Sequence, residues 1–413
     1  MAKWPKLTLR EAGVALIDCD HRTPPACDAG FPYVAIPQLR NGWIDFSDVR
    51  KISAEDFIDW TRKAKPKAHD VVLSRRCNPG ETAYVPPGIE FALGQNLVLL
   101  RASGEKVYPP FLRWLVRGPE WWEQIAKFLN VGALFDSLKC ADVPDFELHI
   151  PPMEEQRAIA RILGTLDGKI ELNRRMNETL EAMARALFKS WFVDFDPVRA
   201  KAEGRDPGLP KHLADLLPDS FEESELGEIP KGWEVVSLRQ LASIQGGKQL
   251  PTEQCQPDGN YPVYGANGVM GYSDRPTHQG FVIVFGRVGA YCGSIHWSYG
   301  GAWVNNNASA IVPTSWPEYV LQATLDIDFQ AMRTGSAQPF IPNTALAEAR
   351  VLRPGDGSLQ AYCATARHLR LQQSSQDNQS RTLAALRDAL LPKLISGEIR
   401  VPKLGEHVKE RLT

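Results

Sequence analysis

Residues 151–192 read PPMEEQRAIARILGTLDGKIELNRRMNETLEAMARALFKSWF, and this stretch decides the fold. Mostly apolar side chains recur in it at alternating intervals of four and three residues, over more than four heptads. That spacing predicts a coiled-coil helix roughly 60 Å long at about 1.5 Å per residue. Its seam includes two asparagines, which would lower stability but fix register and partner choice. The predicted seam residues are Ile159, Leu163, Leu166, Ile170, Asn173, Asn177, Leu180, Ala184, Leu187 and Trp191.

A second helical pattern, from Pro354 to about Ile395, repeats the first after a shift of 203 positions. The shift places Pro354 on Pro151 and Leu390 on Leu187 without a gap. An internal repeat indicates the architecture before any local feature does. The second seam is more polar, so we expect it to need a partner helix, and the first helix is the obvious candidate. Its predicted residues are Tyr362, Ala366, Leu369, Gln373, Gln376, Ser380, Leu383, Arg387, Leu390 and Leu394.

Bulk composition limits the class of protein. A chain of 413 residues is too long for one ordinary hydrophobic core, so we expect more than one domain. Its content of 43% apolar and 23% charged residues is typical of a globular protein. No apolar run approaches a membrane span, and the N-terminus lacks a signal core, so no membrane association is expected. Seven cysteines and eight histidines show no metal-ligand spacing. We therefore expect a cytoplasmic protein without a metal site.

Two regions of short strands accompany the helices, and they correspond loosely. Residues 71–76 resemble 282–287, and Gln95-Asn96 aligns with Asn306-Asn307. The prediction is an α+β fold with a pseudo-two-fold repeat, in which two mixed α/β modules are separated by two long antiparallel helices. The predicted segments are a first module at 1–150, a central helix at 151–196, a connector at 197–230, a second module at 231–353, and a second helix with a tail at 354–413.

The sequence offers no convincing catalytic motif. Gly164–Lys169 has the wrong spacing for a phosphate-binding loop and falls inside the heptad helix. Cys77–Gly80 is not the Asn-Pro-Pro-aromatic run of adenine methyltransferases, and Pro144–Glu147 lacks the lysine of a nuclease motif. We therefore expect no catalytic residues and no cofactor bound by this chain.

The remaining polar residues suit DNA binding. Lysine and arginine neutralise phosphates, and arginine, asparagine, glutamine and lysine read base edges. Taken singly, each candidate is more often a solvated charge or a turn residue. Arg76 and Arg287 are the strongest single candidates, because the repeat places them at one framework position. The candidates are Arg62, Lys63, Lys65, Lys67, Arg75, Arg76, Gln95, Asn96, Lys248, Gln249, Arg275, Arg287, Asn305, Asn306, Asn307, Arg333, Ser336 and Gln338.

Several stretches together resemble the specificity subunits of type I restriction–modification systems. The resemblance covers nearly the whole chain and contains no catalytic motif. One departure is the start of the second helix, which reads Pro354-Gly355-Asp356-Gly357-Ser358-Leu359 in place of Pro-Pro-x-x-Glu-Gln. The similar stretches are 151–160, 166–170, 188–198, 232–238, 334–341 and 390–399.

The resemblance implies a role. Such subunits carry two target recognition domains, each reading one half of a split double-stranded DNA sequence. Two methylation subunits dock on them and use S-adenosylmethionine, and two restriction and translocation subunits use ATP and magnesium. Two other classes remain as alternatives. One is a structural coiled-coil protein with two modules that bind ligands other than DNA, and the other is an enzyme with a fused methyltransferase, which the missing Asn-Pro-Pro run disfavours.

Overall fold

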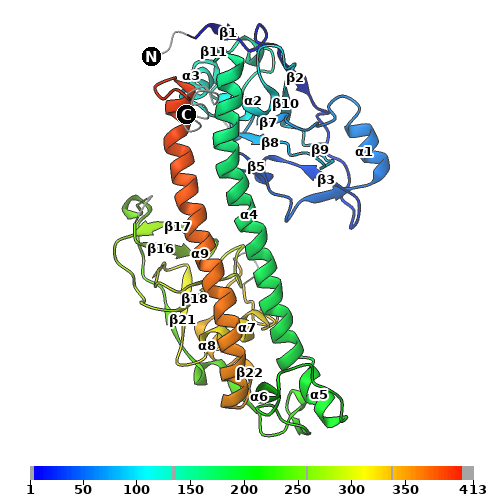
Figure 1. Cartoon of the computed structure of the whole chain (residues 1–413), viewed down its shortest axis with the longest axis vertical. Helices are drawn as coiled ribbons and strands as arrows, with labels where there is room; N and C mark the ends of the chain where they lie inside the picture. The colour runs from blue at the N-terminus through cyan, green and yellow to red at the C-terminus, as the bar shows by residue number, and fades with distance from the viewer. Residues whose placement is uncertain (1–3, 133–135, 257–258, 336–337, 402–413) are drawn as a thin grey trace, which may run out of the picture. The chain divides into compact units, whose positions relative to one another are not determined.

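The computed structural model describes residues 4–132, 136–256, 259–335 and 338–401. It has an α+β fold dominated by two long helices, α4 and α9 (Figure 1). Among the described residues, no helix combines the length and apolar character that crossing a bilayer requires.

The two long helices confirm the heptad prediction. Helix α4 spans Met153–Phe192 and α9 spans Asp356–Ile395. Helix α4 begins directly after Pro152, and α9 begins two residues after Pro354, so a proline precedes both helices. Helix α4 carries Glu154 and Glu155 in its first turn and Lys189 in its last, the charge order that the helix dipole favours.

The chain divides into two compact units. Unit 1 contains residues 1–171 and 381–413, and unit 2 contains residues 172–380. Each unit therefore includes one strand-rich region and part of both long helices. The predicted segmentation placed the helices outside the modules, whereas the contacts group each helical segment with the strands beside it.

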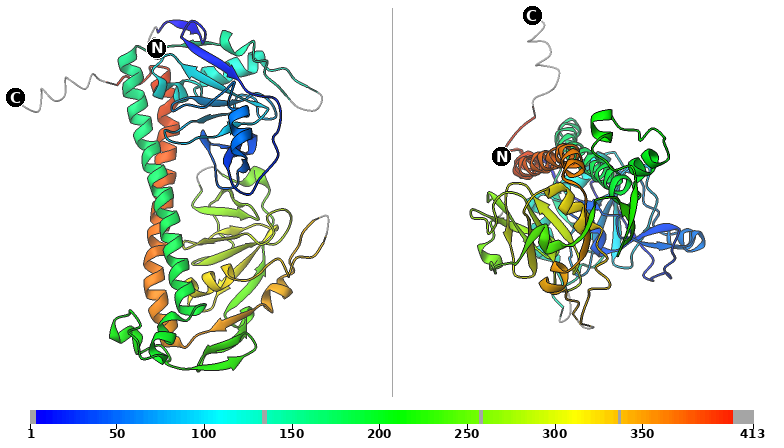
Figure 2. Two further views of the ribbon diagram at one scale, coloured as in Figure 1. Left: turned by 90° about the vertical axis from the view of Figure 1, so that its right-hand side faces the viewer. Right: turned by 90° about the horizontal axis from the view of Figure 1, so that it is seen from below.

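Unit 1 is built on a four-stranded sheet in the order β2-β10-β7-β8 and a three-stranded sheet in the order β6-β3-β9. One apolar core joins the four-stranded sheet to α2 and to the helix pair, with Val71, Trp114, Leu163 and Leu394 among its buried members (Figure 2). The strands are β1 (Lys6–Thr8), β2 (Val14–Asp18), β3 (Phe31–Val34), β4 (Leu39–Arg40), β5 (Trp43–Ile44), β6 (Arg50–Ile52), β7 (Val71–Ser74), β8 (Thr82–Tyr84), β9 (Ala92–Leu93), β10 (Leu97–Ala102) and β11 (Glu147–His149). The short helices are α1 (Ala54–Trp60), α2 (Pro109–Leu115) and α3 (Pro119–Phe128).

Unit 2 has a four-stranded sheet in the order β15-β21-β18-β19 and a three-stranded sheet in the order β17-β16-β20. Its core joins Ile283 and Ile311 of the sheet to Phe188 of α4 and Tyr362 of α9. The strands are β14 (Glu234–Ser237), β15 (Ala242–Gly246), β16 (Tyr261–Gly265), β17 (Gly268–Ser273), β18 (Val282–Gly286), β19 (Ile295–Ser298), β20 (Trp303–Val304), β21 (Ala308–Pro313) and β22 (Arg350–Arg353). The helices are α7 (Pro317–Leu325) and α8 (Asn343–Ala347).

The two units share a topology. In unit 1, β3 pairs antiparallel with β6 and parallel with β9. In unit 2, β16 pairs antiparallel with β17 and parallel with β20. The pair β1-β11 likewise has a counterpart in β14-β22. A parallel contact between two short strands is an unusual element, so its presence in both units supports the sequence alignment of the two modules.

The helices pair antiparallel within each unit. In unit 1, Asp167 contacts Arg387. In unit 2, Asn173 Nδ2 donates to Gln379 Oε1 at 2.9 Å, and Asn177 Nδ2 donates to Asp377 Oδ1 at 2.6 Å. Both asparagines therefore meet the partner helix, as the seam prediction required.

Several predicted seam residues are less buried than expected. Ile159, Leu163, Leu180 and Leu394 are buried. The half-buried ones are Leu166, Ile170, Asn177, Leu187, Leu369, Leu383 and Leu390. The neighbours Asp167 and Arg370 are buried instead, at 1% and 0% exposure. Charged side chains occupy these positions because each finds an opposite charge there.

The segment 197–230, predicted as a connector, is folded. It contains α5 (Asp196–Ala202), α6 (Lys211–Ala214) and a hairpin of β12 (Phe221–Ser224) and β13 (Gly227–Pro230). Val198, Leu217 and Ile229 are buried in the core of unit 2. Its prolines and acidic residues gave the segment the composition of a linker, but its spaced apolar residues pack.

Candidate nucleic-acid interface

In unit 1, the end of β7 presents an arginine held by its main chain. The Arg75 amide donates to the Asn96 carbonyl at 3.1 Å, and the Leu138 amide donates to the Arg75 carbonyl at 2.8 Å. Asn96 lies just before β10, the neighbour of β7 in the sheet. Three segments that are distant in sequence therefore meet at Arg75.

Unit 2 repeats this arrangement at the end of β18. The Arg287 amide donates to the Asn307 carbonyl at 3.2 Å, and the Ile341 amide donates to the Arg287 carbonyl at 3.0 Å. Asn307 lies just before β21, the neighbour of β18. Arg287 thus occupies in unit 2 the place that Arg75 occupies in unit 1. We name these two places the strand-end sites.

This correspondence corrects the predicted pairing of Arg76 with Arg287. Arg76 forms a β-bridge with Ser137, and its counterpart Val288 forms one with Phe340. The alignment of the two valine-rich strands was therefore wrong by one residue.

Hydrogen bonds hold each of the two guanidinium groups on one side. Arg75 Nη2 lies 3.1 Å from His21 Nδ1 and 3.5 Å from the Gln95 carbonyl. Arg287 donates Nε and Nη2 to the Asn306 carbonyl at 3.3 and 3.2 Å and lies over the Phe340 ring. In each arginine, Nη1 forms no hydrogen bond to any residue that the structure describes. An anchored arginine with free donors is suited to a phosphate or a guanine edge.

The basic run 62–76 is less positive in its surroundings than its sequence suggests. Arg62 pairs with Asp59 at 2.8 Å, and Lys65 Nζ lies 2.8 Å from Glu90. Lys63 and Lys67 are exposed. Exposed ion pairs contribute little stability, but in each one the carboxylate offsets the positive charge that a phosphate would meet.

The candidates of unit 2 fall into two groups. Asn305 is buried, and its side chain accepts from the Leu250 amide at 3.2 Å and donates to the Leu250 carbonyl at 3.4 Å. It therefore holds its loop in place, and its role as a DNA contact stays a prediction. Ser336 lies outside the described residues. The exposed candidates are Lys248, Gln249, Arg275, Asn306, Asn307, Arg333 and Gln338.

A close group of possible metal ligands stands beside Arg75 but forms a hydrogen-bond network. Asp18, Cys19 and His21 have ligand atoms within 4.8 Å of one another. The Cys19 thiol donates to the Gly94 carbonyl at 3.3 Å, and burial raises its pKa to about 12. His21 Nε2 lies 3.1 Å from Asp18. The nearby Arg75 cation and the protonated thiol favour orientation of His21 over binding of an ion.

Buried ion clusters join each strand-rich region to both long helices. In unit 1, Asp167 of α4 contacts Arg113 of α2 and, at 2.8 Å, Arg387 of α9. The Arg113 guanidinium lies 4.3–4.5 Å from the ring centres of Trp43, Tyr84 and Trp114. Burial lowers the pKa of Arg113 to about 10, so the group stays charged at neutral pH.

In unit 2 the central buried residue of the cluster is an arginine, where unit 1 has an aspartate. Arg370 of α9 pairs with Glu181 of α4, donates to Gln373 at 2.8 Å and lies over the Trp297 ring of β19. Heptad spacing placed Arg387 and Gln373 on the predicted seam but gave no sign of Asp167 or Arg370, which lie beside the seam positions. The shift of 203 positions, which places Arg370 on Asp167, is the one sequence signal that could have found them.

The strand-end sites and the helix pair can be compared with known proteins. The family model described as type I restriction modification DNA specificity domain matches residues 22–182 and 230–351. The chain belongs to this specificity family. The two matched stretches each contain one strand-end arginine, Arg75 or Arg287.

Two relatives are similar to this chain in sequence, and one solved structure is similar to it in fold. The chain is 29% identical over 239 residues to the type I restriction enzyme HindI specificity subunit of Haemophilus influenzae, covering 48% of this chain and 52% of that protein. It is 25% identical over 315 residues to the MjaIX specificity subunit of Methanocaldococcus jannaschii, covering 67% and 66%. The matches thus span about half to two thirds of these relatives. The S subunit structure from M. genitalium has a similar fold, with a TM-score of 0.55 at 16% identity over 95% of this chain and 96% of that one.

The different starts of the two helices in this specificity-family chain have a structural reason. Gln156 accepts from the Tyr108 amide at 2.7 Å and donates to the Lys106 and Pro151 carbonyls at 2.7 and 2.8 Å. Its counterpart Leu359 is buried in the apolar core of unit 2. Gln156 therefore fixes a loop of unit 1 through hydrogen bonds, whereas Leu359 packs into the apolar core of unit 2.

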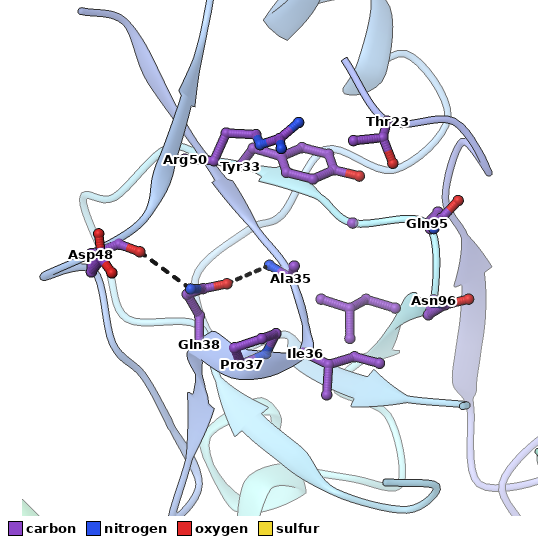
Figure 3. Close-up of a pocket in the computed structure, with 12 residues that line it drawn as sticks. Thr23, Tyr33, Ala35, Ile36, Pro37, Gln38, Asp48, Arg50, Gln95 and Asn96 are labelled. Carbon is purple, nitrogen blue, oxygen red and sulfur yellow. Dashed lines mark hydrogen bonds between the residues drawn. The ribbon is translucent and has the colours of Figure 1, made fainter. Parts of the chain in front are cut away.

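A pocket of about 380 Å³ adjoins the strand-end site of unit 1 (Figure 3). Thr23, Gln95 and Asn96 lie along one side, and Gln38 and Asp48 lie on the other. Sequence analysis selected Gln95 and Asn96 as DNA contacts but gave no sign of the pocket, because most of its other lining residues come from β3 and the segments around it.

Proposed function

We propose that this chain is the DNA specificity subunit of a type I restriction–modification complex. Its two units would act as two target recognition domains related by a pseudo-two-fold repeat, each reading one half of a split double-stranded DNA sequence. The observation that carries the proposal is the pair of strand-end sites, in which Arg75 and Arg287 are held by the same main-chain bonds. Membership of the specificity family supports the same role.

Recognition would use the two arginines with the exposed amides beside them. Arginine can bond to guanine O6 and N7, and asparagine or glutamine can bond to adenine. Gln95 and Asn96 in unit 1, and Asn306 and Asn307 in unit 2, stand next to the arginines in the fold. Lys63, Lys67 and Lys248 would add phosphate contacts, which raise affinity without selecting a sequence.

The chain would act without chemistry of its own. Two methylation subunits would dock on the helix pair and use S-adenosylmethionine to methylate adenine, and two restriction and translocation subunits would use ATP and magnesium. The buried ion clusters at Asp167 and Arg370 support a rigid attachment of each recognition domain to the long helices, because breaking them would leave buried charges without a partner. Such an attachment would hold each recognition domain at a fixed place beside its methylation subunit.

The test is co-expression with the methyltransferase encoded beside this gene, followed by genome-wide mapping of methylated adenines. Two half-motifs with a fixed spacer support the proposal. The variants Arg75→Ala and Arg287→Ala should each impair recognition of a different half-motif. A stable complex that methylates no defined sequence would refute the proposal and favour a structural protein whose modules bind other ligands.

A further inference from the structure

We propose that the pocket beside the strand-end site of unit 1 receives a nucleobase turned out of the DNA duplex. The inference rests on the proposed function and deepens it, because it gives unit 1 a second way of reading DNA beside the strand-end arginine. The pocket has about 380 Å³, ample room for one base, and Gln95 and Asn96 form part of its wall. DNA held by Arg75 would therefore lie next to its opening.

Unit 2 carries a different residue at the corresponding place. The Gly94 amide donates to the Val34 carbonyl at 2.7 Å, and the Asn305 amide donates to the Tyr264 carbonyl at 2.8 Å. Gly94 and Asn305 thus hold the same main-chain place, two residues before Asn96 and Asn307. In unit 2 this place carries a buried amide side chain that is bonded to both peptide groups of Leu250.

In unit 1 the same place carries no side chain. A Cβ added to Gly94 would lie 2.9 Å from the Val34 carbonyl oxygen, closer than real Cβ atoms come, so any larger residue would force the backbone to move. Gly94 itself lines the pocket. Unit 1 therefore has main chain of Val34 and Ala35 at the place where unit 2 has a buried amide side chain, and Gly94 forms part of the pocket wall there.

The chemistry of the lining fits a flat heteroaromatic ring. Tyr33 and Arg50 lie together at one end of the pocket, and Ile36 and Pro37 lie at the other (Figure 3). The Tyr33 hydroxyl donates to the Arg22 carbonyl at 3.2 Å and its ring is buried with Phe57 and Trp60, so the half-buried Ile36 and the exposed Pro37 offer the apolar surface for a base. Extruded bases are held by stacking on aromatic or apolar groups and by hydrogen bonds to their edges.

Unused polar groups are available for the base edge. Arg50 donates Nη1 to the Pro24 carbonyl at 3.0 Å, and its Nε and Nη2 have no partner among the described residues. Thr23, on the opposite side, forms no hydrogen bond within the described part of the chain through its hydroxyl or its peptide groups. Gln38, by contrast, is fully engaged with Ala35 and Asp48, so it shapes the pocket and does not compete for the ligand.

The experiment uses the complex with the methylation subunit and the DNA target found by methylation mapping. In a series of duplexes, the base opposite each position of the first half-site is replaced by an abasic residue. The methylated adenine and its partner are left intact, so extrusion of that adenine is not measured. Removing the opposite base abolishes the cost of unpairing, so binding should tighten roughly tenfold or more at the position whose base enters the pocket.

Variants of the pocket decide the assignment. Thr23→Trp fills the pocket from its exposed rim and should remove the gain at that position, and Ala26→Trp, an exposed change on the same loop outside the pocket, should keep it. A second variant, Arg50→Ala, removes hydrogen-bond donors without adding bulk and should reduce the gain in affinity. It keeps the inference testable if Thr23→Trp does not fold. Absence of any such position, or an equal gain in the filled variant, would overturn the inference. Failure of the proposed function would look different, because the complex would then show no preference for any defined duplex.

Discussion

The variant Asp167→Ala tests whether the buried ion cluster holds unit 1 together. Asp167 is 1% exposed and is the common partner of Arg113 and Arg387, whose side chains are 9% and 8% exposed. Removing the carboxylate leaves the buried Arg113 guanidinium without its counter-ion and Arg387 with only the exposed Asp388. Breaking a buried pair in this way costs about 3–5 kcal/mol, so we expect a loss of that size in the free energy of unfolding.

The assay is urea denaturation of the purified chain, followed by hydrogen exchange of peptides from α2, which reports on unit 1. A matched control is Glu178→Ala, which removes an i,i+4 pair with Arg174 whose side chains are 62% and 56% exposed. Its expected cost is only about 0.3–0.5 kcal/mol. The triple variant Arg113→Met, Asp167→Leu, Arg387→Met should recover most of the loss, because apolar residues of similar size carry no desolvation penalty. A loss below about 1 kcal/mol for Asp167→Ala would contradict the reasoning.

Three further predictions follow from the sites. Arg75→Ala and Arg287→Ala should each weaken binding of the mapped target by about 1–3 kcal/mol in a titration, and Arg76→Ala should weaken it less, since the fold pairs Arg75 and not Arg76 with Arg287. Asn305→Ala should lower the free energy of unfolding by about 1–3 kcal/mol and leave the methylated motif unchanged, because its amide is buried against main chain; an altered motif would show that it reads DNA. Burial alone would raise the pKa of Glu181, but the Arg370 guanidinium beside it holds that pKa below its ordinary value. This stabilisation should therefore be complete above the unfolded pKa of about 4.3 and be lost as pH falls below it through the lower pKa of the folded state, and Glu181→Gln should flatten stability profiles measured below pH 5.

The long helices could be predicted from sequence, because their periodicity is local. The predicted bounds agree with Met153–Phe192 and Asp356–Ile395 to within two residues. The seam was less well predicted, since Asp167 and Arg370 are buried only because other elements supply opposite charges and aromatic rings. Such partners are distant in the sequence, so no heptad pattern can show them.

The candidate sites were predicted in part. Two runs of valine and isoleucine can be aligned in more than one register, so the sequence could not choose between Arg75 and Arg76, and main-chain hydrogen bonds made the choice. The triple asparagine gave three equal candidates, and burial separated Asn305 from Asn306 and Asn307. The pocket is lined by segments that are distant in the sequence, at 23, 33–38, 48–50 and 94–97, so no local pattern shows it.

The most direct test of the central claim is the map of methylated adenines produced by this chain with its methylation partner. Two conserved half-motifs separated by a fixed unspecified spacer are predicted, with Arg75→Ala affecting one and Arg287→Ala affecting the other. A single continuous motif, or two variants that impair the same half, would contradict the claim that each unit reads its own half of the target.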